Sequence, residues 1–238
     1  MARRKVLPPD AAQRGQNGGP MAEPLHKALI VRTALDLLQS EGLDGISMRK
    51  IADLLGVKAA ALYYHVKDKD ELLALLADRI GSETGLPDEG LAWRESLRQW
   101  SIRFREALGR YRDSAAVMNA TLVSGESRLE HAEFLFRTLS EAGFEDANVP
   151  WLAAMLKNYV LGFADEERRL AERAQGDELS LSELETEQSD RFRALSPERY
   201  PHLIRLAAYT VSTEWDREFA FGLDVLLDGF EARLSGRR

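Results

Sequence analysis

The side chains that enzymes most often use are few in this chain, and their spacing does not suit catalysis. Histidine occurs 4 times, and no pair of histidines stands at a spacing typical of a metal site. The chain has no cysteine, and no glycine pattern marks a nucleophile elbow. Carboxylates are abundant but fall on charged helix faces and in one polar stretch. The sequence therefore predicts no enzymatic activity, no bound metal and no cofactor.

Residues 47–66 instead have the pattern of two short helices joined by a tight turn. Ser47 suits the N-cap of the first helix, because its hydroxyl can accept a hydrogen bond from an unpaired backbone N–H. One apolar face follows at helical spacing, made of Ile51, Leu54 and Leu55. Gly56 can adopt the left-handed conformation that ends a helix, and a second helix is expected over 58–65. Such a pair is a helix-turn-helix, whose second helix enters the DNA major groove.

The charge of the chain is unevenly distributed along its 238 residues. Residues 1–80 carry 12 Lys and Arg against 10 Asp and Glu, whereas residues 81–238 carry 20 against 29. DNA would therefore meet the front of the chain, although the formal net charge is -7. No apolar run reaches the roughly 18 residues of a membrane helix, and the N-terminus lacks the apolar segment of a signal peptide. We expect a cytoplasmic protein without membrane contact, which the absence of cysteine also fits.

Every strong periodicity is helical, which predicts an all-α fold. Helices over 24–41 and 68–80 would support the helix-turn-helix pair. After a linker at 81–90, further helices are expected over 91–108, 111–118, 127–142, 147–174, 197–209 and 214–234. Residues 175–195 are polar and acidic, and we interpret them as a mobile loop.

Three regions follow from these patterns. Residues 1–23, which are rich in Arg, Gly and Pro, cannot build a core and are expected to form a disordered basic arm. The arm either touches DNA phosphates or is dispensable. Residues 24–82 form the expected DNA-binding domain, and residues 83–238 form a larger helical domain.

Six short pieces of the first half lie in one register: Ala34–Leu38, Gly42, Ser47–Ala52, Leu55–Val57, Leu62–Val66 and Lys69–Leu73. Together they resemble the DNA-binding domain of the tetracycline-repressor (TetR) family. Weaker matches to the ligand-binding core of the tetracycline repressor continue at Trp93, Phe104-Arg105, Arg112-Asp113, Ala142–Phe144, Leu161-Gly162 and Phe219–Leu223. The resemblance breaks down over 175–195. Over the rest of the chain, the resemblance implies an effector-binding and dimerisation role for residues 83–238.

In that family, the start of the first helix of the pair and the second helix face DNA. The resemblance implies DNA contacts from Ser47, Met48, Arg49, Lys50, Lys58, Ala59, Ala60, Tyr63, His65 and Lys69. Arg49 falls on a base-contacting position, where an arginine can bond the O6 and N7 of guanine. The alternative for Lys50 and Lys69 is a solvated charge, and for His65 a packed ring.

The operator is expected to differ from that of the tetracycline repressor. Ala59-Ala60-Ala61 replaces bulkier and polar base-reading residues, and alanines offer only methyl contacts. More of the discrimination would then rest on Arg49, Lys58 and DNA shape. Tyr64 matches a position that is more often part of the domain packing.

The resemblance also implies a small-molecule pocket in the second domain. The matching positions are mostly apolar, as such pockets are: Trp100, Phe104, Met118, Thr121, Leu122, Met155, Asn158, Tyr159 and Phe163. The alternative for each of them is plain core packing.

The pocket positions depart from those that hold magnesium-tetracycline. Met118 replaces a metal-ligating histidine and is no ligand for a hard cation. Asn158 matches a second pocket histidine, Leu122 matches a pocket arginine, and Glu166 matches an acidic residue near the metal. We therefore expect no magnesium-tetracycline recognition and a larger or more apolar effector.

Wide apolar stripes on helices 147–174 and 214–234 indicate a further contact surface. In the family these helices pair with their symmetry mates as a four-helix bundle, which implies a homodimer on a palindromic operator. The alternative is that both stripes are used inside one subunit. By analogy, an effector would move segment 111–122 and shift helix 68–80, and so weaken operator binding.

The predicted function is therefore a sequence-specific transcriptional repressor, released from a double-stranded DNA operator by a small-molecule effector. One alternative is an architectural or constitutive DNA-binding regulator without a ligand, whose aromatic core is pure packing. An activator also fits, because the sign of regulation depends on where the operator lies relative to a promoter. A pocket in the core favours the sensor, and a solid core favours the alternative.

Overall fold

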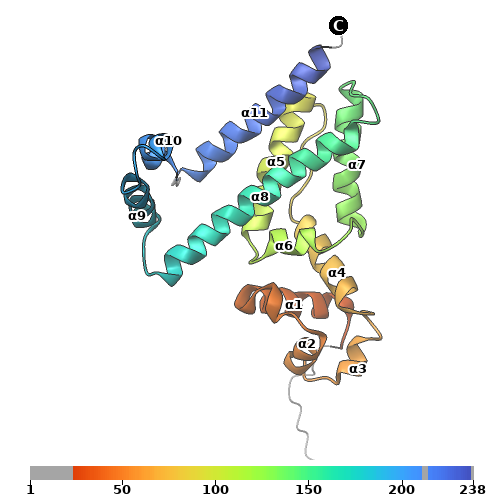
Figure 1. Cartoon of the computed structure of the whole chain (residues 1–238). Coiled ribbons are helices and arrows are strands. Elements are labelled where there is room, and N and C mark those ends of the chain that lie inside the picture. Colours follow the sequence, from red (N-terminus) through yellow and green to blue (C-terminus); the bar gives the residue numbers. More distant parts are fainter. Residues whose placement is uncertain (1–23, 211–213, 237–238) are drawn as a thin grey trace, which may run out of the picture.

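A computed structural model describes residues 24–210 and 214–236, and these residues form helices without any strand (Figure 1). The expected all-α fold is confirmed. The predicted arm over 1–23 lies outside the described residues. Within the described part of the chain, every helix is too short or too polar to cross a membrane.

The smaller, N-terminal part is built from four helices and one 3-10 turn. These are α1 (Lys27–Glu41), η1 (Leu43–Gly45), α2 (Met48–Leu54), α3 (Ala59–Leu62) and α4 (Lys69–Gly81). Ser47 caps α2 by accepting a hydrogen bond from the Lys50 backbone N–H at 3.2 Å. Gly56, with φ 66°, makes the turn that the helix-turn-helix requires.

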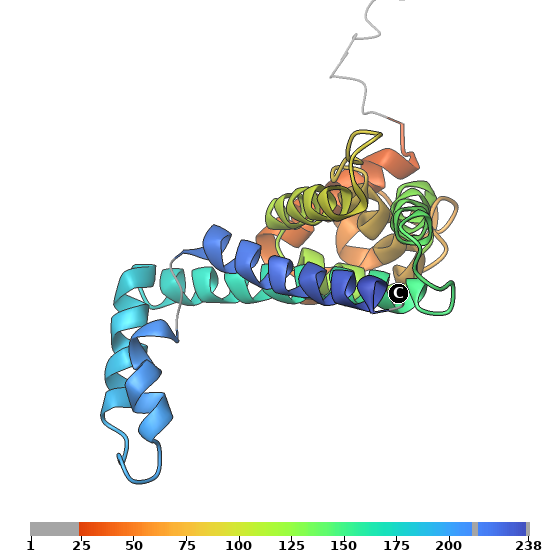
Figure 2. The same ribbon diagram turned by 90° about the horizontal axis from the view of Figure 1, so that it is seen from above.

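The larger part begins with α5 and ends with α11. Its elements are α5 (Trp93–Gly109), α6 (Ser114–Asn119), α7 (Glu126–Glu141), α8 (Val149–Gly176), α9 (Leu181–Arg193), α10 (Pro201–Leu206), η2 (Ala207–Tyr209) and α11 (Trp215–Ser235). The long helix α8 packs against α5, α6, α7 and α11. Figure 2 shows α8 and α11 side by side, with α5 and α7 on one side of the pair. Helix α4 continues from the smaller part and packs against α6 and α7.

The interpretation of residues 175–195 as a loop is wrong, because most of them form α9. A capping box starts this helix: the Ser180 hydroxyl accepts from the Glu183 N–H, and the Glu183 carboxylate accepts from the Ser180 N–H at 2.7 Å. Arg191 and Glu187 then pair one turn apart at 2.5 Å. With α10, this helix forms a hairpin that projects from the end of α8 (Figure 2).

Candidate nucleic-acid interface and ligand core

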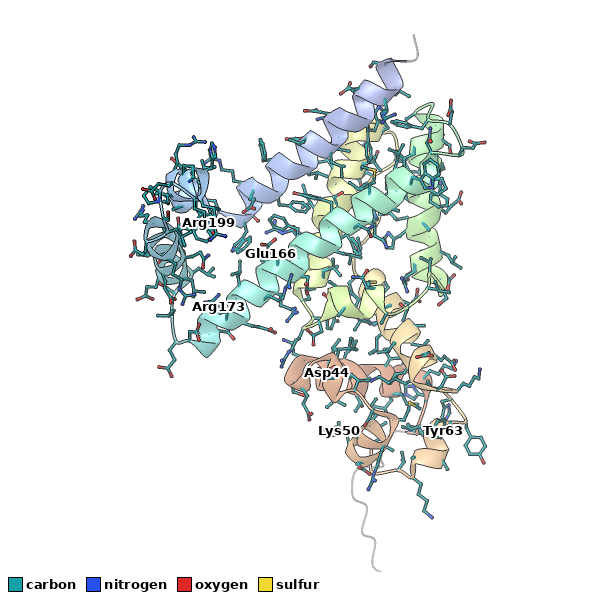
Figure 3. All side chains as sticks on the ribbon, in the orientation of Figure 1. Asp44, Lys50, Tyr63, Glu166, Arg173 and Arg199 are labelled. Atoms are coloured by element: carbon teal, nitrogen blue, oxygen red, sulfur yellow. The ribbon has the colours of Figure 1, made fainter. Side chains whose placement is uncertain are left out.

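The outer side of α2 and α3 carries most of the residues predicted to contact DNA. Ile51 and Leu62 are fully buried and fix how the two helices are rotated. The predicted contact residues with exposed side chains are Ser47, Arg49, Lys58, Ala60, Tyr63 and Lys69. Figure 3 shows Lys50 and Tyr63 on the part of the molecule that lies farthest from α11. A DNA duplex can therefore approach these side chains without meeting the larger part of the chain.

The remaining predicted DNA contacts are less exposed. Lys50, Ala59 and His65 are half-buried, and the Lys50 ammonium forms an ion pair with Glu41. Met48 is only 8% exposed, because its side chain packs into the domain core. The side chain of Met48 therefore cannot meet a base, and only its backbone N–H at the start of α2 can face a phosphate.

Tyr64 is 89% exposed, so the expected packing role for this ring is wrong. It follows Tyr63 directly after α3, where the backbone turns, and Val66, two residues further on, enters the core instead. Two neighbouring phenol rings thus extend from the end of the second helix of the pair. Their hydroxyl groups are hydrogen-bond donors of the kind that contact phosphates in protein–DNA complexes.

A buried aromatic cluster holds part of the predicted pocket. The ring centroids of Trp100 and Phe104 lie 4.9 Å apart, and Trp100 is 3% exposed. Met118 on α6 is also buried in this core. Thr121 is half-buried, and its hydroxyl accepts a hydrogen bond from Arg128 at 2.7 Å. These four predicted residues lie where α5, α6 and α7 meet.

His131 also belongs to this cluster, although it was not among the predicted pocket residues. The Trp100 indole Nε1 donates to His131 Nδ1 at 3.2 Å. The other ring nitrogen, Nε2, lies 3.0 Å from the carbonyl oxygen of Gly81, the last residue of α4. Burial lowers the pKa of His131 from its ordinary value of 6.5, so the neutral imidazole is favoured.

Arg128 binds the end of α6 to α7. Its guanidinium donates to the Thr121 hydroxyl and, at 3.0 Å, to the Leu122 carbonyl. Its backbone N–H donates to the Asp78 carboxylate of α4 at 3.0 Å. Helices α4, α6 and α7 therefore meet at one polar junction beside the aromatic cluster.

Tyr159 and Phe163 belong to a second cluster, which faces α11. Tyr159 stacks on Phe219 with 5.4 Å between ring centroids, and Phe163 lies 5.9 Å from Trp215. Burial raises the pKa of Tyr159 to about 12, so its hydroxyl stays protonated and donates to the Phe219 carbonyl at 2.7 Å. These two predicted pocket residues therefore brace α8 against α11.

Three predicted pocket residues point elsewhere. Leu122 is 89% exposed in the turn between α6 and α7, and Met155 and Asn158 are exposed on α8. The side chains of a helix are spread around its axis, so the matched positions on α8 divide between different faces. The predicted set of nine residues therefore does not converge on one cavity.

A cleft of about 1070 Å³ opens between α5, α8 and α11, beside the end of α1. None of the predicted pocket residues lines this cleft. Arg105 and Glu167 lie on its wall and form a two-bond pair, with both N–O distances at 3.0 Å. Arg168, also on the wall, is paired with carboxylates of its own helix and with Asp113. The lining is thus polar, and these arginines on the cleft wall are paired with neighbouring carboxylates.

The turn between α5 and α6 connects the cleft to the smaller domain. Arg112, which lines the cleft, donates from its backbone N–H to the Gln39 side chain of α1 at 2.9 Å. Its guanidinium donates to the Ser40 carbonyl at 3.3 Å. Asp113 accepts a hydrogen bond from the Leu43 backbone N–H at 2.7 Å. Two successive residues therefore fix how α1 sits on the larger domain.

The residues at the matched metal position do not fit magnesium. Met118 offers a thioether, and Mg²⁺ prefers oxygen ligands in near-octahedral geometry. Glu166, the matched acidic residue, is exposed on α8 (Figure 3). Among the described residues, no three His, Asp or Glu side chains come together in a way that could hold a metal ion.

Two sequence families match consecutive parts of the chain. Residues 30–76 match the family described as bacterial regulatory proteins, tetR family. Residues 86–234 match the family described as tetracyclin repressor-like, C-terminal domain. The resemblance seen in the sequence is therefore confirmed for both domains.

Individual relatives are similar over most of their length. The class D tetracycline repressor protein of Escherichia coli is 32% identical over 215 residues, which is 89% of this chain and 91% of that protein. The crystal structure of ActR from Streptomyces coelicolor in complex with actinorhodin is 29% identical, with a TM-score of 0.77, and covers 88% of this chain and 96% of its own. BioQ with its double-stranded DNA operator is 28% identical, with a TM-score of 0.61, over 88% of this chain and 99% of its own.

Proposed function

The chain belongs to the tetR family of bacterial regulatory proteins, and on that premise we propose that it is a homodimeric repressor released from its operator by a small molecule. The observation that carries this proposal is the exposed donor surface of α2 and α3 on a domain whose other side is buried. Residues 24–82 would read DNA, and residues 83–238 would bind the effector and the second subunit.

The DNA-binding part of the proposal rests on which side chains are open to solvent. Arg49 and Lys58 are exposed within the helix-turn-helix, and an arginine there can bond both acceptors of a guanine edge. Tyr63 and Tyr64 add two exposed phenols at the end of α3. BioQ, which has the same fold, is known with a double-stranded DNA operator. We assign the operator contacts to these residues and to Ser47, Lys50, Ala59, Ala60, His65 and Lys69.

The dimer rests on exposed apolar side chains of α8 and α11. Trp151 is 69% exposed and Phe221 is 71% exposed, and Met155 and Val225 are exposed on the same two helices. Single exposed apolar residues are common, but large aromatic side chains on two adjacent helices are typical of an interaction surface. A two-fold pairing of this surface would place two helix-turn-helix units on one palindrome.

The effector part of the proposal rests on the aromatic cluster around Trp100 and on the relatives. ActR, whose fold this chain shares, binds actinorhodin, so this architecture accommodates a small molecule. Trp100, Phe104, Met118 and Thr121 would contact the effector, with His131 and Arg128 as polar groups at the edge. Mostly apolar walls with few polar groups favour a largely apolar aromatic ligand.

One observation favours a regulator that needs no ligand. Trp100 packs directly against both Phe104 and His131, and it is almost completely buried. An effector at this cluster must therefore open the core as it binds. A constitutive regulator would keep this core closed under all conditions.

A direct test measures operator affinity with and without a bound compound. Aromatic compounds are first screened for those that raise the thermal unfolding temperature, since a ligand of the native state stabilises it. The affinity for a selected operator duplex is then measured by fluorescence anisotropy at a saturating concentration of each stabilising compound. We expect at least a tenfold rise in the Kd for DNA. Equal operator affinity with every saturating ligand would exclude effector release and leave the constitutive regulator.

A further inference from the structure

One imidazole connects the aromatic cluster to the end of the helix that leads to the DNA-binding domain. His131 accepts a hydrogen bond from the Trp100 indole at 3.2 Å and lies 3.0 Å from the Gly81 carbonyl. We propose that His131 is a positioning residue that couples the state of the Trp100 cluster to α4 and so to operator affinity. This inference rests on the proposed function and adds the residue through which effector binding acts.

The chemistry of the three partners fixes the direction of both bonds. An indole N–H can only donate, so His131 Nδ1 must be the acceptor. A carbonyl oxygen can only accept, so the proton of the neutral ring must be on Nε2, facing Gly81. Only one of the two neutral tautomers makes both bonds. We call these two hydrogen bonds, from Trp100 to His131 and from His131 to Gly81, the His131 link. The link is therefore either complete or broken, as a switch element requires.

Helix α4 can transmit a displacement at Gly81 to the DNA-binding domain. Helix α4 has 13 residues, so it spans about 20 Å at 1.5 Å per residue. Leu72 and Leu76 are fully buried, so one helix belongs both to the small domain core and to the junction with α6 and α7. Asp68 caps its other end, a few residues after α3. A displacement at Gly81 is thus carried to the DNA-contacting end of the domain.

A ligand can break the link by competing for one proton. Trp100 has a single side-chain donor, and His131 uses it in the described structure. An aromatic ligand with a carbonyl or other acceptor oxygen beside Trp100 would take that N–H. His131 would then lose one of its two anchors, and its bond to Gly81 would no longer be held in place. The structure thus favours effectors that bear an acceptor oxygen on an aromatic frame.

Protonation of His131 would break the same link without any ligand. An imidazolium has two donors and no acceptor, so it cannot receive the Trp100 N–H. The charged groups near the ring are Asp78 from α4 and Glu130 from α7, which favour the proton, and Arg128, one turn earlier on α7. Helix α5 presents the neutral Trp100. Burial opposes these carboxylates, so the link is intact at neutral pH.

The test compares operator affinity between variants and across pH. His131→Phe removes both hydrogen bonds and keeps a ring in the space, and Glu133→Gln, at an exposed carboxylate of the same helix, is the control. The Kd for a selected operator duplex is measured by anisotropy between pH 5.5 and pH 8, a range chosen around the ordinary histidine pKa of about 6.5. At pH 8 we expect His131→Phe to bind about three- to tenfold more weakly than wild type, a size that fits the loss of this hydrogen-bonded link. Glu133→Gln should bind like wild type at every pH.

The pH profile separates a positioning role from a merely structural one. As the pH falls, wild type should lose operator affinity relative to His131→Gln, because Gln cannot take up a proton. The ratio of the Kd of wild type to the Kd of His131→Gln at each pH removes the contribution of other histidines, including His65 near the DNA. If His131 has only a structural role, His131→Gln should have a lower thermal unfolding temperature. The plots of operator Kd against pH for wild type and His131→Gln should then run parallel. Parallel profiles, together with wild-type affinity of His131→Phe, would overturn the proposal.

Trp100→Phe gives an independent route if His131→Phe does not fold. This change keeps an aromatic ring and removes only the indole donor to His131. We expect the same weakening of operator binding, and no further loss when His131→Gln is added. Fully additive losses would show that the two residues act separately and contradict the link. If wild type itself selects no operator, the proposed function fails first, and that outcome is distinct from a failure of the His131 link.

Discussion

Asp113 and Leu43 are joined across the boundary between the two domains, because the Asp113 carboxylate accepts a hydrogen bond from the Leu43 backbone N–H at 2.7 Å. The other carboxylate oxygen lies 3.2 Å from Arg168 of α8. Asp113 has φ 55°, a left-handed conformation that Asp and Asn tolerate better than most residues. One carboxylate thus ties the long helix α8 to the turn after α1.

Asp113→Asn should weaken operator binding while leaving the fold intact. Asn tolerates the same backbone conformation and can still accept from Leu43, but it loses the charge that faces Arg168. We expect the operator affinity of the ligand-free protein to fall by about three- to tenfold, roughly 0.7–1.4 kcal/mol, because a neutral amide binds Arg168 and the Leu43 N–H less strongly than a carboxylate does. Anisotropy with the operator duplex measures this change. Asp165→Asn is the matched control, since it removes another Arg168 partner, at 3.1 Å, that does not touch Leu43. An equal effect of both substitutions would argue against a special role for the Asp113 junction.

Arg49→Ala should weaken specific DNA binding by about 1–3 kcal/mol, because a bidentate contact to guanine would be lost. Arg49 is exposed, so the unfolding temperature should change little. Competition between the selected operator and a scrambled duplex measures the specific part of the affinity. Arg137→Ala removes an exposed arginine from α7 and serves as the charge-matched control. Unchanged affinity of Arg49→Ala for the best operator would refute its assignment as a base reader.

Phe221→Glu should separate the subunits, because it introduces a charge into an exposed aromatic position of α11. We expect a monomer at concentrations where wild type sediments as a dimer, and a loss of operator binding that higher protein concentration partly restores. Analytical ultracentrifugation measures the assembly. Phe136→Glu, at an exposed ring on α7, is the control and should remain dimeric. A monomeric wild type, or a dimeric Phe221→Glu, contradicts the assignment of this surface.

Gly222→Ala should destabilise the fold by about 1–3 kcal/mol, the usual effect of overpacking. A Cβ at Gly222 would overlap the Tyr159 hydroxyl and lie 2.9 Å from its Cε2, so the ring that braces α8 against α11 would have to move. Gly109→Ala is the control, since a Cβ there would meet open space. Urea unfolding of both variants measures the difference. Equal stabilities would show that Tyr159 does not require close approach at Gly222.

The free energy of unfolding should fall as the pH drops below about 6.5, in part because of His131. Burial lowers the pKa of His131 in the folded state below its ordinary value of 6.5. The unfolded chain therefore takes up a proton first, and this favours unfolding until the pH passes the lowered folded pKa. Urea unfolding at several pH values measures the slope. His131→Gln should show a smaller slope than wild type in this window, whereas identical slopes would place the titration elsewhere.

The helix-turn-helix and the core of its domain could be predicted closely from the sequence. Ser47, Ile51 and Gly56 have local roles, in a cap, an apolar face and a turn, and the structure confirms each of them. Leu54, which was predicted to share the face of Ile51, is instead 59% exposed. The helix α9 was missed because its charge density outweighed the Ser180 and Glu183 capping pattern. Tyr64 was misplaced because its exposure depends on where the backbone turns after α3.

The candidate ligand core was harder to predict, because a matched position does not fix the rotation of a helix. Tyr159 and Phe163 turned toward α11, whereas Met155 turned to solvent. His131 was not predicted at all. Its partners are an indole 31 residues away and a backbone carbonyl, and a backbone acceptor has no trace in the sequence.

We propose above that two copies of this chain read one palindromic operator. Selection of bound sequences from a random duplex library at physiological salt tests it most directly, with the protein-to-DNA ratio measured on the best duplex. We expect an enriched palindrome whose half-sites lie about one helical turn or more apart, bound by two subunits. Weak, salt-sensitive binding without any enriched sequence would contradict it, because phosphate contacts alone produce that behaviour.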